Sequence, residues 1–454
     1  MQRLSQIRNP FSTLRRCVRG GIVAIGITIV GSSLGCDAPI DSFEPNRLFA
    51  KRLELNEGVE LEPVGDDVES LLLELFGTPD QPLWPVELQG DGARLEGEAR
   101  ADKLEARSAG DDKLEAYPTG DDKLEAYPTG ELVSVERLQR AAGPVYSDEA
   151  GTHYGMYREL CILCHGISGN GAGATSRLLN PYPRDFRMGK FKFKSPPIGS
   201  RPTRDDLRQL LLNGEAGTSM PSFALLPDQD VEALLDYVIY LSIRGEVERG
   251  LLMRATYDLD ADEQLTRDDA VELAVNAARK WAEAESQAIS VPPPPADLPL
   301  VGTTLASPAE RELLDASIEH GRQLFVGQVA NCASCHGPQG AGDGTNTDFD
   351  DWTKDWTTQA GLDPLDKQQL RPMRALGGLK PRHIEPRNLQ SGIYRGGSRP
   401  EDLYRRIVLG IEGTPMPAVP LQPENAQGLT ERDVWDLVNF LLSLPSRSEG
   451  GTKS

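Results

Sequence analysis

Two short motifs in this chain of 454 residues combine a pair of thiols with an imidazole at the same spacing. They read Cys161-Ile162-Leu163-Cys164-His165 and Cys332-Ala333-Ser334-Cys335-His336. C-x-x-C-H is the attachment pattern of c-type haem, because two thiols one helical turn apart can add across the two haem vinyl groups. The adjacent histidine is the expected proximal ligand of the iron. The sequence therefore predicts two covalent haem c groups, with His165 and His336 as iron ligands.

Two other uses of such motifs fit the sequence less well. A tetrahedral zinc site would need a fourth ligand for each motif, and only His153, His320 and His383 remain as further histidines. A thioredoxin-like redox pair follows a strand of a βαβ unit, and no such unit is predicted around either motif.

The remaining cysteines, Cys17 and Cys36, lie in an N-terminal region typical of an export signal. Several arginines precede the apolar stretch 22–30, which is too short to span a bilayer. Ser33-Leu34-Gly35-Cys36 follows and resembles a bacterial lipoprotein signal, in which the cysteine is acylated. We expect a lipoprotein-like signal peptide over residues 1–36 and a lipid on Cys36. That places the chain on the periplasmic face of a membrane. Ordinary cleavage and an uncleaved anchor are the alternatives.

Charge is unevenly distributed along the chain. Asp37–Ala150 holds 28 acidic and 11 basic residues, a net charge of −17, which argues against nucleic acid as a partner. Pro181–Arg208 and Arg371–Arg406 are basic, with net charges of +5 and +6. These two stretches are either docking surfaces or solvated loops.

The periodicity of apolar residues predicts an all-α chain. Val231–Ile243 and Glu431–Leu444 are expected to form the closing helices of two domains, and Ala316–Phe325 the opening helix of the second. The predicted parts are an acidic, largely irregular segment with ten-residue repeats (37–140), a first domain (141–245), a helical and proline-rich connector (246–309), a second domain (310–446) and a tail (447–454). Within the acidic segment, the only predicted helix is Val68–Phe76.

Around the motifs the chain resembles class I c-type cytochromes, which are small all-helical haem proteins. Gly321 and Phe325 match the glycine and aromatic of that family's opening helix, and the resemblance gives them Trp435 and Phe440 as partners on the closing helix. The first domain matches less well, because His153 stands where the glycine is usual. Tyr157 then supplies the aromatic, and Gly155 is the alternative glycine.

The two domains also resemble each other. Pro183-Arg184-Asp185-Phe186 parallels Pro386-Arg387-Asn388-Leu389, and both domains carry the frame Gly-x-x-Gly-Thr-x-Met-Pro. The second domain has an insertion at residues 345–379. The family resemblance implies that the methionine of each frame, Met220 and Met416, is the second axial ligand of an iron. For the first haem, His153 is the alternative. The candidates for contact with haem propionates are Arg184, Arg187, Lys190, Tyr394 and Arg395.

The resemblance implies a lipid-anchored dihaem electron carrier rather than an enzyme. The expected partners are a respiratory membrane complex or other redox proteins; the sequence leaves the oligomeric state open. The alternative is a haem enzyme, either a dihaem peroxidase or the haem subunit of a small-molecule dehydrogenase. Catalysis at an iron needs an open sixth position, which two methionine ligands would close.

Overall fold

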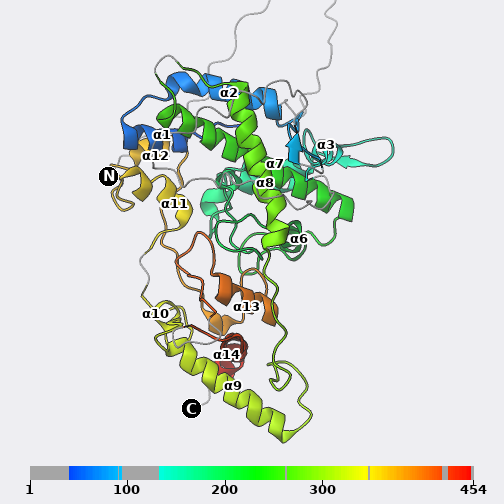
Figure 1. Ribbon diagram of the computed structural model, residues 1–454, viewed down its shortest axis with the longest axis vertical. Coiled ribbons are helices and arrows are strands. Elements are labelled where there is room, and N and C mark those ends of the chain that lie inside the picture. The colour runs from blue at the N-terminus through cyan, green and yellow to red at the C-terminus, as the bar shows by residue number, and fades with distance from the viewer. Residues whose placement is uncertain are drawn as a thin grey trace, which may run out of the picture. The chain divides into compact units, whose positions relative to one another are not determined.

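Helices dominate the computed structural model, which describes residues 40–89, 92–94, 132–260, 263–345, 348–421 and 428–450 (Figure 1). In this part of the chain the strands form two short antiparallel pairs, β1 (Glu87–Gln89) with β2 (Gly92–Arg94) and β3 (Tyr146–Ser147) with β4 (His153–Tyr154). The prediction of a helical chain is therefore confirmed. None of the helices described here has both the length and the apolar character needed to cross a membrane. The signal peptide with Cys36, the ten-residue repeats and residues 451–454 lie outside the described residues.

The first haem motif lies in a run of helices between residues 132 and 257, here called the first segment. Its helices are α3 (Val135–Ala141), α4 (Met156–Leu160), α5 (Ile162–His165), η2 (Ser176–Leu178), η3 (Phe186–Met188), α6 (Arg204–Asn213) and α7 (Asp228–Tyr257). The Thr203 side chain accepts from the backbone of Asp206, whose own side chain accepts in return, so a capping box begins α6. The buried face of α7 packs against α3, α6 and η3.

Helix α7 is longer than predicted. A domain boundary was expected at residues 245–246, but α7 runs through that point without a break. Ile243, Val247 and Leu251 are fully buried at four-residue spacing, so the apolar face of the helix continues past the expected end. Gly245 does not end the helix; a side chain there would collide with Arg187 of η3. The expected helix end at Ile243 is therefore wrong, and the boundary of the first domain stays a prediction.

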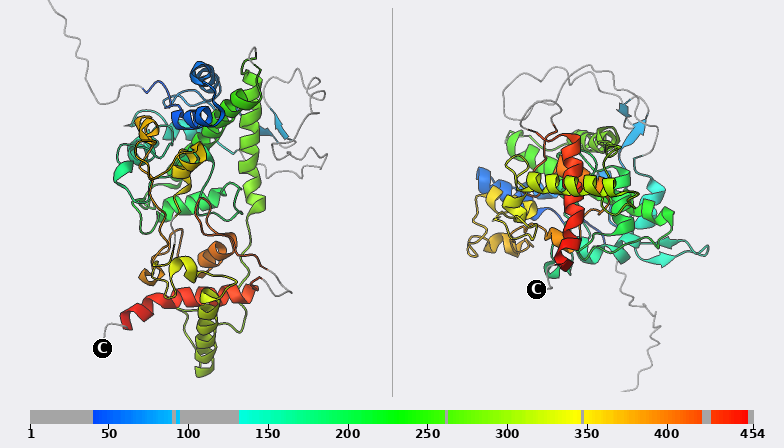
Figure 2. Two further views of the ribbon diagram at one scale, coloured as in Figure 1. Left: turned by 90° about the vertical axis from the view of Figure 1, so that its left-hand side faces the viewer. Right: turned by 90° about the horizontal axis from the view of Figure 1, so that it is seen from below.

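The second haem motif lies between residues 308 and 450, here called the second segment. Its helices are α9 (Pro308–Val326), α10 (Ala333–His336), α11 (Asp351–Asp355), η4 (Thr358–Ala360), α12 (Arg371–Ala375), η5 (Leu389–Ser391), α13 (Pro400–Leu409) and α14 (Glu431–Gly450). Figure 2 shows that α9 and α14 cross steeply. Helix α14 extends past the predicted end at Leu444 and into the region predicted as a tail.

The crossing of α9 and α14 depends on Gly321. A Cβ atom at this position would collide with the backbone carbonyl of Asp436 on α14, so only glycine permits this approach. Four residues further along α9, Phe325 packs on Phe440 with ring centroids 5.1 Å apart, which confirms that predicted pair. Trp435 instead has Tyr404 of α13 as its ring partner, at 4.9 Å.

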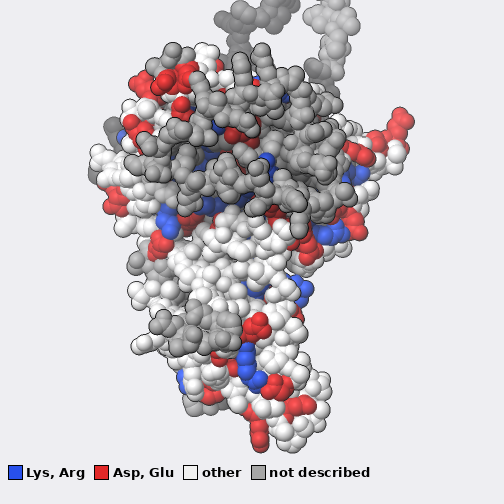
Figure 3. Space-filling model, in the orientation of Figure 1, with Lys and Arg blue, Asp and Glu red and all other residues white. Residues whose placement is uncertain are grey.

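The described part of the acidic segment before the repeats is largely helical. Two helices, α1 (Arg47–Glu57) and α2 (Glu62–Phe76), precede the repeats and belong to the same apolar core as the first segment. Phe49 and Leu53 of α1 are buried at four-residue spacing, as are Leu72 and Phe76 of α2. The acidic side chains occupy the opposite faces, and Figure 3 shows them gathered over these helices. The helix predicted at Val68–Phe76 is confirmed as part of α2. The expected irregularity is wrong for residues 47–76, where α1 and the start of α2 are also helical.

The connector is part of both apolar cores. Helix α8 (Arg267–Gln287) lays small alanines and Trp281 against α7. The chain beyond the proline run is fastened to α14 of the second segment, because Asn439 accepts a hydrogen bond from the Val301 backbone (3.0 Å) and donates one to the Pro299 carbonyl (3.0 Å). The connector is therefore packed at both of its ends.

The insertion at 345–379 also packs inside the chain. Trp356, Ala360, Leu370 and Met373 form a small core that Leu48 of α1 joins. Asp355 accepts hydrogen bonds from Arg52 of α1 and from Arg249 of α7, the latter at 3.0 and 3.1 Å. This buried carboxylate ties the second segment to the first.

The packing of α9 on α14 yields a stability prediction. Gly321→Ala places a methyl group against the Asp436 carbonyl, so we expect it to lower the free energy of unfolding by about 1–3 kcal/mol. The matched control is Gly65→Ala in α2, where an added Cβ atom meets nothing within 4 Å. The control should be neutral or raise stability by about 0.5–1 kcal/mol. Denaturant unfolding measures both, and equal effects would contradict the assigned role of Gly321.

Candidate haem-binding sites

Each CxxCH motif folds into one helical turn. The backbone N–H of His165 donates to the Cys161 carbonyl at 2.8 Å, and that of His336 donates to Cys332 at 2.9 Å. This turn brings both thiols and the imidazole of a motif to one short stretch of helix. The four cysteines are free thiols and form no disulfide.

The two histidines have the same hydrogen bond. Nδ1 of His165 lies 3.2 Å from the carbonyl oxygen of Arg184, and Nδ1 of His336 lies 3.1 Å from that of Arg387. A carbonyl can only accept, so Nδ1 carries the proton and Nε2 keeps its lone pair. Such a bond orients a metal-ligating histidine and raises its basicity. The two accepting carbonyls belong to the parallel stretches 183–186 and 386–389 that the sequence singled out. The structure thus places each stretch beside the proximal histidine of its own segment.

Burial keeps both imidazoles neutral. It lowers the pKa of His165 to about 4, and it also lowers the pKa of His336. A neutral imidazole with a free Nε2 lone pair is what an iron ligand requires. Together with the free thiols of the same turn, these donors fit a covalently attached haem.

Two of the thiols do not fit a thioredoxin-like use of the motif. Burial raises the pKa of Cys161 to about 12 and that of Cys332 to about 11. A redox nucleophile acts as a thiolate, which requires a lowered pKa. Cys161 and Cys332 therefore give no support to a thioredoxin-like site.

The loop that follows each motif is duplicated, a feature that the sequence analysis missed. Backbone N–H groups of Phe186 and Leu389 donate to Gly169 and Gly340, each at 2.7 Å. Glycines stand at four equivalent positions after the two histidines: Gly166, Gly169, Gly171 and Gly173 in the first segment, and Gly337, Gly340, Gly342 and Gly344 in the second. Their equal spacing from the histidine was the available signal.

The two methionine loops, Gly214–Pro221 and Gly410–Pro417, have the same conformation. The carbonyl of Met220 accepts from Glu215, and that of Met416 accepts from Ile411, each at 3.1 Å. The backbone N–H of each methionine donates to the loop threonine, at 3.1 Å for Thr218 and 3.2 Å for Thr414. Both methionine side chains are half-buried. The duplicated frame therefore builds one loop twice.

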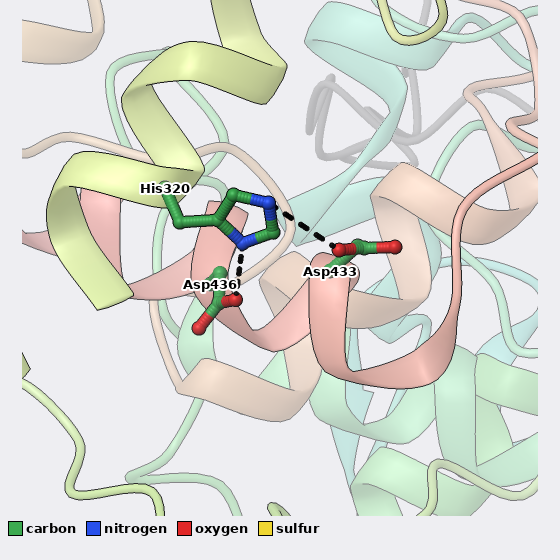
Figure 4. A group of neighbouring side chains, drawn as sticks. All are labelled: His320, Asp433 and Asp436. Carbon is green, nitrogen blue, oxygen red and sulfur yellow. Dashed lines mark hydrogen bonds and ion pairs between the residues drawn. The ribbon is translucent and has the colours of Figure 1, made fainter. Parts of the chain in front are cut away.

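The other histidines have partners of their own. His153 lies at the surface with Nε2 2.6 Å from Glu159, and the His383 ring packs on Phe349 with ring centroids 4.2 Å apart. Figure 4 shows His320 of α9 between two carboxylates of α14. Its Nδ1 lies 2.7 Å from Asp436 and its Nε2 3.8 Å from Asp433, so this group ties α9 to α14.

The candidates for propionate contact divide into two groups. Arg187 is paired with Asp185, Lys190 is paired with Asp351, and the Tyr394 hydroxyl donates to the Leu441 carbonyl. Arg184 and Arg395 each keep a buried nitrogen without a hydrogen-bond partner among the described residues. Burial lowers the pKa of Arg184 to about 10, which leaves it protonated at neutral pH.

The basic stretch at 181–208 is used within the chain. Its three lysines pair with acidic residues of the second segment: Lys190 with Asp351 (2.8 Å), Lys192 with Asp350 (3.0 Å), and Lys194 with Glu412. These three lysines are therefore partnered within the chain, a use not expected from the sequence.

Two family models match this chain, one around each haem motif. Residues 318–445 match the family model described as "Cytochrome c", and residues 149–238 match the model described as "Cytochrome C oxidase, cbb3-type, subunit III". Among curated proteins no significant match is found. A solved structure, the Kuenenia stuttgartiensis reducing HAO-like protein complex Kustc0457/Kustc0458, is similar over 66% of this chain and 97% of its own, with 23% identity and a TM-score of 0.39.

Proposed function

Because the chain is a tandem c-type cytochrome, we propose that it is a dihaem electron carrier, with one covalent haem c in each segment. Haem-based electron transfer is the activity that its cytochrome c segments imply. When bound, haem supplies an iron that cycles between the ferric and ferrous states. The chain supplies the attachment thiols, one proximal imidazole for each haem and the second axial ligand.

The observation that carries the proposal is the shared geometry of His165 and His336. In both segments a backbone carbonyl holds the Nδ1 proton, so the Nε2 lone pair is free at a fixed orientation. A single histidine could make such a contact by chance. The same contact at the parallel residues Arg184 and Arg387, each after a CxxCH motif, is best explained by two haem sites.

The duplicated methionine loops favour a carrier over an enzyme. We assign Met220 and Met416 as sixth ligands, because both occupy the same place in loops with the same hydrogen bonds. Thioether sulfur is a soft, neutral ligand that favours ferrous iron. Two haem irons that each hold a histidine and a methionine as axial ligands would have no open position for a peroxide or another substrate, and little would rearrange during electron transfer.

Substitution of the methionines tests this assignment. The ferric protein should show the weak red absorbance band of sulfur–iron ligation, and its intensity should correspond to two methionine-ligated irons per chain. Met220→Ala and Met416→Ala should each remove about half of that band, since each is assigned to one of two equivalent irons. Each variant should also bind carbon monoxide at one ferrous haem. Visible absorption spectra of the oxidised and reduced protein measure all three.

The control is Met253→Ala on α7, a partly exposed methionine outside both loops, which should leave the band unchanged. If Met220→Ala also left it unchanged, the first haem would have another sixth ligand. Peroxidase activity after half-reduction of the protein would then favour the enzyme alternative.

We also propose that the chain is exported and held at the periplasmic face of a membrane by a lipid on Cys36. The basic, then apolar N-terminus and the Ser33–Cys36 sequence support this. A tethered carrier stays near membrane-bound partners, and a respiratory complex such as a quinol-oxidising complex or a terminal oxidase is the proposed partner.

Replacement of the proposed lipid site should change where the protein is found. Cys36→Ser removes the acylated thiol, so the mature chain should move from the membrane fraction to the soluble fraction with both haems attached. Fractionation followed by mass spectrometry of the N-terminal peptide measures this. A wild-type peptide that begins after Cys36 and carries no lipid would refute the anchor.

A further inference from the structure

Each methionine loop is in contact with an arginine of the opposite segment. The second glycine of each loop, Gly217 or Gly413, has a positive φ of 68° or 71°. A Cβ atom at Gly217 would lie 2.6 Å from Nη2 of Arg387, which belongs to the second segment. A Cβ atom at Gly413 would meet Trp352 at 3.1 Å and Asp351 at 3.4 Å before Nη1 of Arg184, which belongs to the first segment, at 3.8 Å. Each arginine thus lies beside the methionine loop of the other segment, Arg387 more closely than Arg184.

These two arginines are the residues that orient the proximal histidines. Arg184 gives its backbone carbonyl to His165 of its own segment, and Arg387 gives its carbonyl to His336. Each residue thus contacts the proximal histidine of one segment with its backbone and the methionine loop of the other with its side chain. The equivalent sequence positions of Arg184 and Arg387 show that this crossed arrangement follows from the duplication.

The charges of both guanidinium groups are left without an ion pair. In the part of the chain that the structure describes, neither Arg184 nor Arg387 forms a salt bridge, and each has one buried nitrogen without a hydrogen-bond partner. Arg184 lies on the ring of Trp352, 3.4 Å from its centroid, and Arg387 donates to the Ile393 carbonyl at 3.3 Å. The acidic residues near Arg184 are taken by the lysines of the first segment. At the first loop, Arg387, Arg395 and Arg406 all act on the single carboxylate of Glu215, so the arginines outnumber it. At the second loop, Glu412 also acts on Arg184 but is paired with Lys194. Positive charge therefore remains in excess beside each methionine loop.

We propose that Arg184 and Arg387 are positioning residues that raise the redox potential of the haem in the opposite segment, Arg387 for the first haem and Arg184 for the second. The inference rests on the proposed dihaem function. A nearby positive charge disfavours ferric iron relative to ferrous iron, and burial weakens the screening of that charge by solvent and salt. Because each charge belongs to one segment and acts on the other, each potential depends on the contact between the segments.

The test is a redox titration of the full-length holoprotein, followed by visible spectroscopy. Cys161→Ala distinguishes the first haem by leaving it attached through one thioether, which displaces its visible band; if that chain is not recovered with two haems, Cys332→Ala distinguishes the second instead. In this background, Arg387→Gln should lower the ferrous-to-ferric ratio of the first haem at a fixed potential about tenfold. This corresponds to a fall of about 59 mV in its redox potential, and the potential of the second haem should shift less. Arg184→Gln should do the reverse.

Two controls separate charge from packing. Arg387→Lys and Arg184→Lys keep the charge and should restore most of each shift. Arg432→Gln removes an exposed arginine of α14 that pairs with Asp297, and should move neither potential. The proposal is wrong if each Gln variant acts mainly on the haem of its own segment, or if Lys and Gln variants shift the potentials equally. Fewer than two haems in the wild-type protein would instead defeat the proposed function itself.

Discussion

A backbone carbonyl holds the Nδ1 proton of His165, an equivalent one holds that of His336, and both proposed haem sites depend on these contacts. A hydrogen bond of this kind contributes only about 1 kcal/mol to stability. Its value is chemical, since it fixes the tautomer and orientation of an iron ligand. In the first segment the carbonyl comes from 19 residues beyond the histidine, and in the second from 51 residues beyond it. The same contact is thus closed by loops of very different length.

The longer loop of the second segment contains the insertion, and its packing explains how the two segments share their structure. The insertion forms a small core with α1, and Asp355 is held by arginines of α1 and α7. Directly beside it, Asp350 and Asp351 pair with lysines of the first segment. The loop that closes the second histidine contact therefore also attaches the two segments to each other.

The sequence was informative where a local pattern determines the structure. The CxxCH turns, the closing helices α7 and α14, and the Gly321–Phe325 face of α9 all follow from spacing within a few residues. In the acidic segment the apolar spacing of Val68–Phe76 predicted the second half of α2, whereas α1 was missed because Phe49 and Leu53 stand among many charged residues. The end of α7 was misplaced because Gly245 serves close packing against Arg187 instead of ending the helix.

Features made by contacts between distant residues could not be predicted from local patterns. The basic run that contains Lys190 and Lys194 reads as a free surface until its acidic partners, more than a hundred residues away, are placed beside it. The parallel between Arg184 and Arg387 was visible in the sequence. The sequence did not show that each carbonyl accepts from the histidine of its own segment, or that each side chain reaches the other segment. The duplicated pattern indicated equivalent roles, and the fold shows the contacts behind them.

The central claim is that one chain holds two haems that pass electrons between redox partners and transform no substrate. Its most direct test is a reductive titration of the exported holoprotein, with haem counted by the absorbance of its pyridine complex and protein by amino-acid analysis. The account predicts two covalent haems and two reversible one-electron steps per chain, each with the spectrum of six-coordinate low-spin iron. A single haem, or a second haem whose iron is five-coordinate and reacts with peroxide, would contradict it.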